Sequence, residues 1–228
     1  MAIRSLGGVA LHVVEQWDRL AAGWLVRIAS EGGNVAVSGG STPGRAYELA
    51  AKLLPDWSRS HLWFCDERVV PPDDERSNYR LLQETLLGRL ESLPHVHRIH
   101  GELEPAGAAA QYDEELLGIT LDVALMGIGP DGHTASLFPE APALEERERR
   151  AVAAEPGLEP FVPRVTLTPA VFEATGLLVY LATGEEKADA VRRAFAEEPS
   201  PATPASLIRG RETIAILDAA AAAQLPQG

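Results

Sequence analysis

The sequence contains little cysteine, little lysine and no long apolar run, and each shortage excludes a class of protein. One cysteine, Cys65, cannot form an internal disulfide framework, so the chain suits a reducing compartment and we expect it in the cytoplasm. No apolar run approaches the roughly 20 residues that a transmembrane helix requires. The first residues also lack the basic-then-apolar order of a secretory signal. We therefore expect no membrane partner.

Positive charge is also scarce, since the formal net charge is −13. This argues against a nucleic-acid partner, because a surface that follows phosphates needs basic stripes. An anionic small molecule would be repelled by the overall field, so local cations and backbone amides must overcome that repulsion. Lys52 and Lys187 are the two lysines among twenty basic residues, which makes a lysine in a loop motif informative.

Apolar β-rich runs alternate with amphipathic helical segments throughout the chain. Strands are expected at residues 33–40, 61–70, 121–129, 164–168, 176–184 and 212–218, with a short one at 150–156. Helices are expected at residues 15–30, 44–54, 78–90, 106–117 and 185–196. Such alternation predicts an α/β fold with a mostly parallel, Rossmann-like sheet covered by helices on both faces. With no repeat or linker, we expect a single domain over residues 1–228, and we favour a monomer.

Four polar loops follow predicted strands, at the sheet edge where α/β proteins bind ligands. In the first, "SGGSTPG", Gly39 and Gly40 allow a tight turn and Pro43 suits the first position of a helix. Ser41 or Thr42 would then cap that helix. Its free amides and hydroxyls make Gly40, Ser41 and Thr42 candidates for phosphate binding. A capped helix that binds nothing shows the same pattern, so this motif alone leaves both interpretations open.

A second loop, "GIGPDGH", has the glycine spacing of a dinucleotide-binding turn. However, Pro130 removes an N–H donor and Asp131 places a negative charge where a pyrophosphate would lie. We therefore favour a turn that holds His133 at the sheet edge as a general base, with Asp131 fixing the tautomer of its ring. Residues 133–138 are expected to begin a short helix, whose dipole would favour the neutral imidazole.

The remaining two loops, and one further segment, carry single charged residues beside strands. Asp66, Glu67 and Arg68 directly follow a predicted strand: Arg68 would contact a phosphate, while Asp66 or Glu67 would fix the loop or contact sugar hydroxyls. Arg164 precedes another strand. Lys187 lies in the first turn of a predicted helix, where the dipole disfavours a cation. Either a bound anion or the charges of Glu185 and Glu186 would offset it there. Each of these charges is equally compatible with a solvated surface position.

Other residues with reactive side chains point to simpler roles. His95 and His97 lie on one face of a possible strand, but no Cys, Asp or Glu pattern completes a metal site, so no metal is expected. Cys65 lies in an apolar strand, which favours a buried inert thiol over a nucleophile. No G-x-S-x-G elbow is present, which disfavours a serine hydrolase.

Five of these motifs together resemble the 6-phosphogluconolactonase family, in the same order along the chain from about residue 30 to 215: "SGGSTP", "DER…SNYRLL", "GIGPDGHTASLFP", "PRVTLT" and "TGEEK". The resemblance implies hydrolysis of 6-phospho-D-glucono-1,5-lactone, the second step of the oxidative pentose phosphate pathway, without metal or organic cofactor. It implies His133 as the base. It also implies substrate or phosphate binding by Ser41, Thr42, Arg68, Arg164 and Lys187.

A related family of glucosamine-6-phosphate deaminases remains the alternative. Those enzymes share the "SGGSTP"-like loop and the "DGH" core, but they continue with a run resembling I-A-F-N-E-P, whose glutamate takes part in ring opening. Here Ser136 begins "SLF" instead, and the next glutamate is Glu140. This difference favours the lactonase over an isomerase or deaminase. A sugar-phosphate sensor without catalysis is a third possibility, distinguished by binding without turnover.

Overall fold

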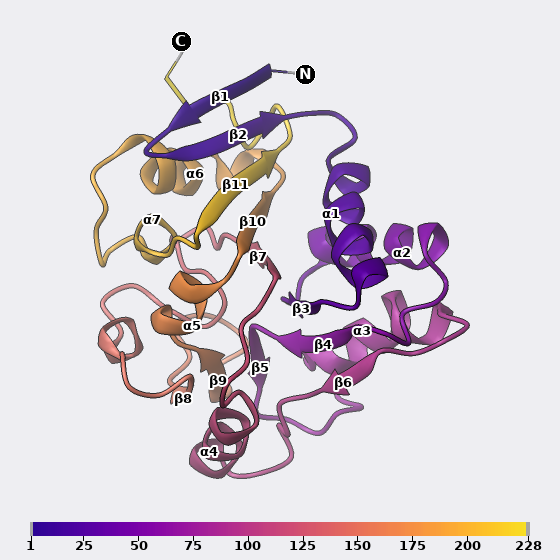
Figure 1. Ribbon diagram of the computed structural model, residues 1–228. Coiled ribbons are helices and arrows are strands. Elements are labelled where there is room, and N and C mark those ends of the chain that lie inside the picture. Colours follow the sequence, from indigo (N-terminus) through magenta and orange to yellow (C-terminus); the bar gives the residue numbers. More distant parts are fainter. Residues whose placement is uncertain (1, 227–228) are drawn as a thin grey trace.

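A large sheet runs through the centre of the protein (Figure 1), whose computed structural model describes residues 2–226. The strand order is β1-β2-β11-β10-β7-β3-β4-β6, and every neighbouring pair except β1–β2 is parallel. All six residues of β10 are buried, as expected for a strand covered on both faces. The strands are β1 (Ala2–Leu6), β2 (Val9–Val13), β3 (Asn34–Val37), β4 (His61–Phe64), β6 (His95–His97), β7 (Val123–Gly127), β10 (Leu177–Ala182) and β11 (Glu212–Leu217).

Helices cover both faces of this sheet, which confirms the predicted α/β class (Figure 1). One face carries α1 (Trp17–Glu31) and α2 (Ser41–Leu53), with α3 (Asn78–Thr85) beside α2; the other carries α5 (Pro169–Ala174), α6 (Ala188–Ala196) and α7 (Pro204–Leu207). Two expected helices are shorter than predicted, because a short 3-10 turn (Leu87–Arg89) follows α3 and another (Glu185–Lys187) precedes α6. No helix within residues 2–226 is both long enough and apolar enough to span a membrane.

A second, three-stranded sheet was not anticipated. It is antiparallel, in the order β5 (Asp66–Arg68), β9 (Arg164–Leu167), β8 (Ala151–Ala154), and α4 (Pro105–Glu115) packs against it. The prediction of one strand over residues 61–70 is therefore wrong, as is the placement of β8 and β9 in the parallel sheet.

The reason lies at Cys65, where the chain passes from one sheet to the other. The Cys65 N–H donates to Val37 O at 2.8 Å in the large sheet, whereas its carbonyl accepts from Leu167 N at 2.9 Å in the small one. The thiol is fully buried, and burial raises its pKa, as expected for an inert core cysteine. The next residues, Asp66 to Arg68, are thereby redirected to pair with β9.

The sequence analysis also missed the N-terminal hairpin formed by β1 and β2. β2 is five residues long and two of them are buried, so it lacks the apolar run that identifies the central strands. It pairs in parallel with β11, the last strand of the chain.

The chain order reverses between β3 and β7, which are neighbours in the sheet. From β3 the chain adds β4 and β6 on one side, and from β7 it adds β10 and β11 on the other. In open α/β sheets, ligands bind outside the carboxyl ends of the strands at such a reversal. The loops that follow β3, β4, β7 and β10 all lie at this edge.

Candidate active site

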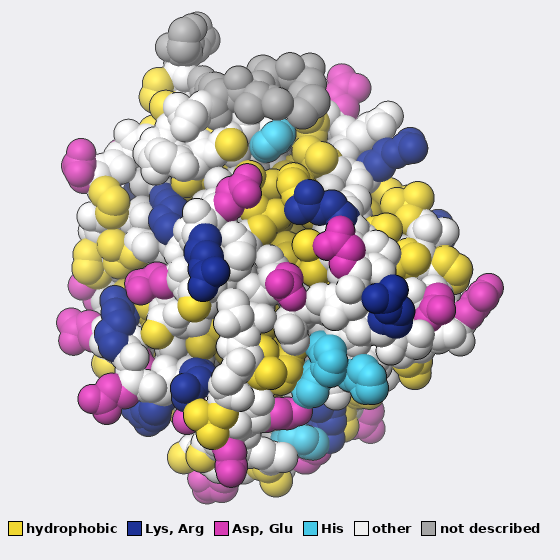
Figure 2. Space-filling view, viewed as in Figure 1, with side chains coloured by type: hydrophobic (Ala, Val, Ile, Leu, Met, Phe, Trp, Pro, Cys, Tyr) yellow, Lys and Arg dark blue, Asp and Glu magenta, His cyan; other side chains and the backbone are white. Residues whose placement is uncertain are grey.

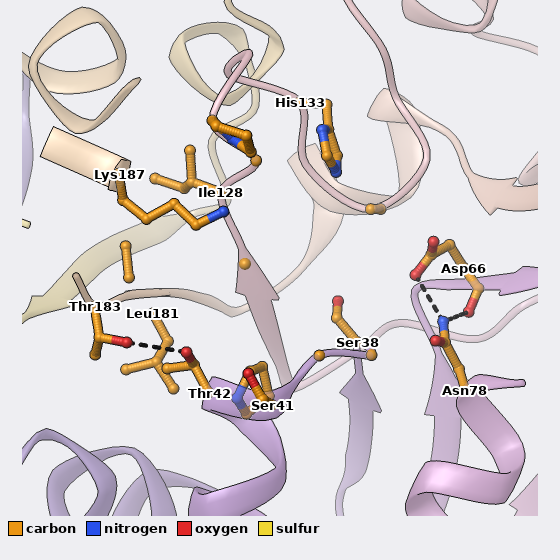
Figure 3. A pocket seen from close by; sticks show the side chains of 18 of the residues that line it. Ser38, Ser41, Thr42, Asp66, Asn78, Ile128, His133, Leu181, Thr183 and Lys187 are labelled. Atoms are coloured by element: carbon orange, nitrogen blue, oxygen red, sulfur yellow. Dashed lines mark hydrogen bonds between the residues drawn. The ribbon is translucent and has the colours of Figure 1, made fainter. Parts of the chain in front are cut away.

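A pocket of about 360 Å³ opens at this edge, and all four predicted loops contribute to it (Figure 3). That volume falls within the range usual for small-molecule sites. Seven of the predicted residues line it: Gly40, Ser41, Thr42, Asp66, Arg68, His133 and Lys187. The other two, Asp131 and Arg164, lie behind the lining and contact it from outside the pocket.

The N-terminus of α2 forms the floor of the pocket. Helix α2 begins at Ser41, and Gly40 precedes it with a φ of 114°, a conformation that favours glycine. The expected start at Pro43 is wrong, and no side chain caps the helix. The chain enters the helix two residues early because Gly40 allows the abrupt turn. The Thr42 hydroxyl instead lies 2.9 Å from the Thr183 hydroxyl in the loop after β10. The uncapped first turn therefore remains available to an anion.

His133 stands on the opposite wall, paired with Asp131. Its Nδ1 lies 2.6 Å from Asp131 Oδ1, and the His133 side chain is 23% exposed. Burial alone would raise the pKa of Asp131, but the hydrogen bond and charge of His133 outweigh it and lower that pKa. Asp131 therefore remains ionised and accepts the Nδ1 proton, which leaves the lone pair of a neutral ring on Nε2.

The expected helix after His133 is absent. Thr134 and Leu137 form an isolated antiparallel bridge, Ala135 takes a positive φ of 49°, and the Thr134 hydroxyl donates to Gly127 O at 2.9 Å. This local bonding replaces helical bonding, so no helix dipole acts on His133. Of the two influences that we expected on the His133 ring, only the contact with Asp131 is present.

Gly129, in the middle of the loop, is required by close approach. A Cβ added at Gly129 would lie 2.0 Å from His133 Nδ1, which is too close for any side chain at position 129. The Gly129 N–H donates to His133 O at 2.8 Å, and the Gly132 N–H donates to Gly129 O at 2.9 Å. Both of these donors are therefore already used within the turn.

Two arginines meet beside the pocket on the small sheet. Arg68 on β5 pairs directly with Arg164 on β9. Arg68 Nη1 donates to Asn78 Oδ1 at 2.7 Å and Arg164 Nη2 to Pro160 O at 2.9 Å, but the Nε of each arginine is buried without a partner. Burial and the charge of Arg68 lower the pKa of Arg164, which is 4% exposed. Neither arginine forms an ion pair within residues 2–226, although the charges of Asp66 and Glu67 partly oppose the lowering of the pKa of Arg164.

The sequence analysis did not foresee the part of Asn78, which lines the pocket, or that of Ser136, which is buried behind it. The Asn78 amide donates to Asp66 O at 2.8 Å, and the Ser136 hydroxyl donates to Asp66 Oδ2 at 2.6 Å. Together they hold the Asp66 carboxylate, which is 6% exposed, at the pocket wall. The start of a helix at "SNY", where Ser77 caps α3, is the one local pattern that could have drawn attention to Asn78. No local signal could have linked Ser136 to Asp66, because seventy residues separate them.

Glu67 points away from the pocket and fixes the same loop. Its carboxylate accepts hydrogen bonds from the backbone N–H groups of Arg68, Asn78 and Tyr79 and from the Ser77 hydroxyl. Burial raises the pKa of Glu67, and the three backbone donors limit the rise. Glu67 thus attaches the first turn of α3 to β5.

Lys187 is the cation on the side of β10. It precedes α6, is half-buried, and forms no ion pair in the described part of the chain. Burial lowers its pKa, while the negative charges of Glu186 and Asp131 act in the opposite direction. Figure 3 shows its side chain extending into the pocket between the N-terminus of α2 and His133. An ammonium group in this position is available to an anion.

The histidines at the other end of the sheet form a separate surface cluster over β4 and β6 (Figure 2). His61 stacks on His95 with ring centroids 4.8 Å apart, and His61 Nδ1 lies 2.9 Å from His97 Nε2. Across the part of the chain that the structure describes, no three or more His, Cys, Asp or Glu side chains are placed to hold a metal ion.

The fold and the pocket together define an α/β protein with a small-molecule pocket where the strand order reverses. The chain belongs to the family of glucosamine-6-phosphate isomerases/6-phosphogluconolactonase, which matches residues 14–216. It is 38% identical over 189 residues to the 6-phosphogluconolactonase of Streptomyces coelicolor, covering 75% of this chain and 72% of that relative. The human 6-phosphogluconolactonase is 37% identical, with coverages of 77% and 73%. The solved 6-phosphogluconolactonase of Trypanosoma cruzi superposes with a TM-score of 0.81 at 27% identity, over 100% of both chains.

Proposed function

We propose that the protein hydrolyses 6-phospho-D-glucono-1,5-lactone to 6-phospho-D-gluconate. The observation that carries this proposal is the His133–Asp131 pair, which stands on the wall of a pocket that also contains an unpaired Lys187 and an uncapped helix N-terminus. A base and an anion site facing each other suit a substrate with a carbonyl at one end and a phosphate at the other. We further propose that the protein works as a single-domain monomer. We also propose that it works in the cytoplasm, because a single, buried cysteine suits a reducing compartment.

The phosphate would bind at the N-terminus of α2, where the amides and hydroxyls of Ser41 and Thr42 meet the Lys187 ammonium. These groups supply the local positive potential that the net charge of −13 requires. Arg68 and Arg164 would supply further contacts to the oxygens of the substrate, and Asp66 would accept hydrogen bonds from sugar hydroxyls. Binding the remote phosphate would hold the lactone carbonyl beside His133.

The chemistry requires one base and no covalent nucleophile, because a δ-lactone is an activated ester. His133 Nε2 would take a proton from water as the water oxygen attacks the carbonyl carbon. The carbonyl oxygen then becomes an oxyanion, and the protonated His133 would return its proton to the ring oxygen as the C–O bond breaks. Since the Gly129 and Gly132 N–H groups are occupied, we assign the stabilisation of the oxyanion to a cationic side chain such as Arg68.

The test is the hydrolysis of freshly made lactone, measured against its uncatalysed decay. Removing the base should lower kcat by about 10²- to 10⁴-fold in His133→Ala. The control is His100→Ala, a surface histidine paired with Glu102 at 3.2 Å. A His133→Ala enzyme with near-normal turnover would exclude this mechanism. Release of ammonia from glucosamine 6-phosphate, with only background lactone decay, would instead indicate a deaminase.

Lys187 offers a second test because the chain contains a matched control. Lys187→Ala should raise KM by about 10- to 100-fold, since a hydrogen bond to a charged group contributes about 1.5–3 kcal/mol. Lys52, the other lysine, is exposed on α2 away from the pocket, so Lys52→Ala should leave KM unchanged. Equal KM values in the two variants would remove Lys187 from the phosphate site.

The geometry does not support the deaminase alternative. Glu140, the first glutamate after the histidine loop, is exposed and has a positive φ of 57°. Its N–H donates to Pro201 O at 3.1 Å, and its side chain does not line the pocket. It therefore does not supply a carboxylate for ring opening beside His133.

A further inference from the structure

Arg193, on α6, binds the loop that carries the candidate base from outside the pocket. Its Nη1 donates to Asp131 O at 3.2 Å and its Nη2 donates to Pro130 O at 3.2 Å. Nη1 also donates to the Thr203 hydroxyl at 2.6 Å, and Nε to Asp189 Oδ2 at 2.8 Å. One guanidinium group therefore holds two successive carbonyls of the loop, and its side chain is only 23% exposed.

The loop from Gly129 to His133 is also held from outside by contacts with other elements. Pro130 has no N–H, so it contributes no backbone donor to the turn. Gly132 packs closely against the same structure, because a Cβ there would lie 2.8 Å from Thr203 Cγ2 and 3.2 Å from Arg193 Nη1. The Gly132 carbonyl in turn accepts from Ala205 N at 2.9 Å. The outer side of the loop is thus fixed by α6 and by residues 203–205.

Helix α6 also connects the contact between Arg193 and the histidine loop to the proposed anion site. Lys187 is the residue that precedes α6, and Arg193 lies in its last turn. The ammonium group that faces the pocket and the guanidinium group that holds the histidine loop are therefore carried by one rigid element. The helix would therefore relate the position of the proposed anion site to that of the base.

We propose that Arg193 is a positioning residue: it holds the Pro130 and Asp131 carbonyls so that the His133–Asp131 pair faces the reacting carbonyl. It does not line the pocket, so it would act on the reaction through the loop and not through contact with the substrate. The inference rests on the proposed function, because it assigns Arg193 a part in the reaction that His133 catalyses.

The experiment compares Arg193→Ala with Arg192→Ala. Arg192 is the neighbouring residue on α6 and also bonds to Asp189, but its other partner is Glu197 rather than the loop. Arg193→Ala should lower kcat by about 10- to 100-fold, because a small misplacement of a base can cost about 100-fold. KM should stay within about threefold, because the groups that face the phosphate are unchanged. Arg192→Ala should leave both constants within about twofold.

Chemical rescue separates positioning from a general loss of structure. Guanidinium ions added at millimolar concentrations should restore part of the kcat of Arg193→Ala and have no such effect on Arg192→Ala. Arg193→Lys should show an intermediate kcat, since one ammonium group cannot reproduce the planar pair of bonds to two carbonyls. It also serves as the test variant if Arg193→Ala does not fold.

The outcomes distinguish this inference from the proposed function. A wild-type protein without lactonase activity would contradict the proposed function. An active wild type whose kcat is unchanged in Arg193→Ala or Arg193→Lys would overturn the role of Arg193 alone. A rise in KM with unchanged kcat would also overturn it, because the residue would then act on substrate binding.

Discussion

Glu67→Gln removes one negative charge from a buried site. It also replaces one carboxylate oxygen, which accepts hydrogen bonds, by an amide nitrogen, which donates them. Oε1 accepts from the N–H groups of Arg68 and Asn78, both at 2.7 Å. Oε2 accepts from Tyr79 N at 2.8 Å and from the Ser77 hydroxyl at 3.0 Å. Glu67 is 2% exposed, so water cannot replace a lost partner.

The cost follows from the two orientations of the new amide. If its nitrogen replaces Oε1, two backbone N–H groups face an N–H donor. If it replaces Oε2, only the Tyr79 N–H does, because the Ser77 hydroxyl can rotate to accept. The cheaper orientation leaves one buried donor unpaired, which costs about 1–3 kcal/mol, and it weakens the other bonds by removing their charge. We expect the free energy of unfolding to fall by about 2–4 kcal/mol.

Urea unfolding followed by circular dichroism measures this change, and the control is Glu84→Gln on α3, the helix whose first turn Glu67 holds. Glu84 is 59% exposed and pairs with Arg80 at 2.9 Å, so its loss should cost no more than about 0.5 kcal/mol. KM for the lactone should also rise in Glu67→Gln, because the carboxylate fixes the backbone of Arg68 and Asn78. If the two variants lose the same small amount, the reasoning about Glu67 is refuted.

Two further predictions test the histidine loop and the surface histidines. Gly129→Ala should lower kcat by about 100-fold, because the new Cβ would lie 2.0 Å from His133 Nδ1, whereas Gly107→Ala on α4, where nothing lies within 4 Å, should retain full activity. Burial, and then the charges of His97 and His95, lower the pKa of His61 below its ordinary value of 6.5. The unfolded chain therefore takes up a proton more readily than the folded protein does. As a result, the free energy of unfolding decreases as the pH falls below about 6.5. In thermal scans from about pH 7 to about pH 5, the Tm of His61→Gln should therefore fall less than that of the wild type, and parallel curves would contradict the assignment.

The central strands and the loops that follow them could be predicted from the sequence, because short local patterns determine both. Continuous apolar runs identified the central strands, and the loops after them contain most of the pocket because parallel strands end at one edge. Pairings between distant segments were not predictable. The transfer of the chain at Cys65 depends on Leu167, and the meeting of Arg68 with Arg164 follows from it.

The helix expected after His133 failed for a related reason. The Thr134 hydroxyl donates a hydrogen bond to the carbonyl of Gly127 at the end of β7, seven residues earlier. A side chain that competes for backbone groups in this way is a recurrent cause of lost helices. The support of the loop by Arg193 was equally invisible, because it depends on where α6 packs.

The position of β11 between β2 and β10 has a consequence for the synthesis of the protein. About 200 residues separate β2 from β11, so the hairpin of β1 and β2 must wait for a strand that is synthesised about 200 residues later. At about 5–20 residues per second, that delay is roughly 10–40 s. Until then the edges of β2 and β10 are unpaired and open to other chains. Loss of β11 would therefore also detach β1 and β2 from the sheet, although these strands lie about 200 residues away in the sequence.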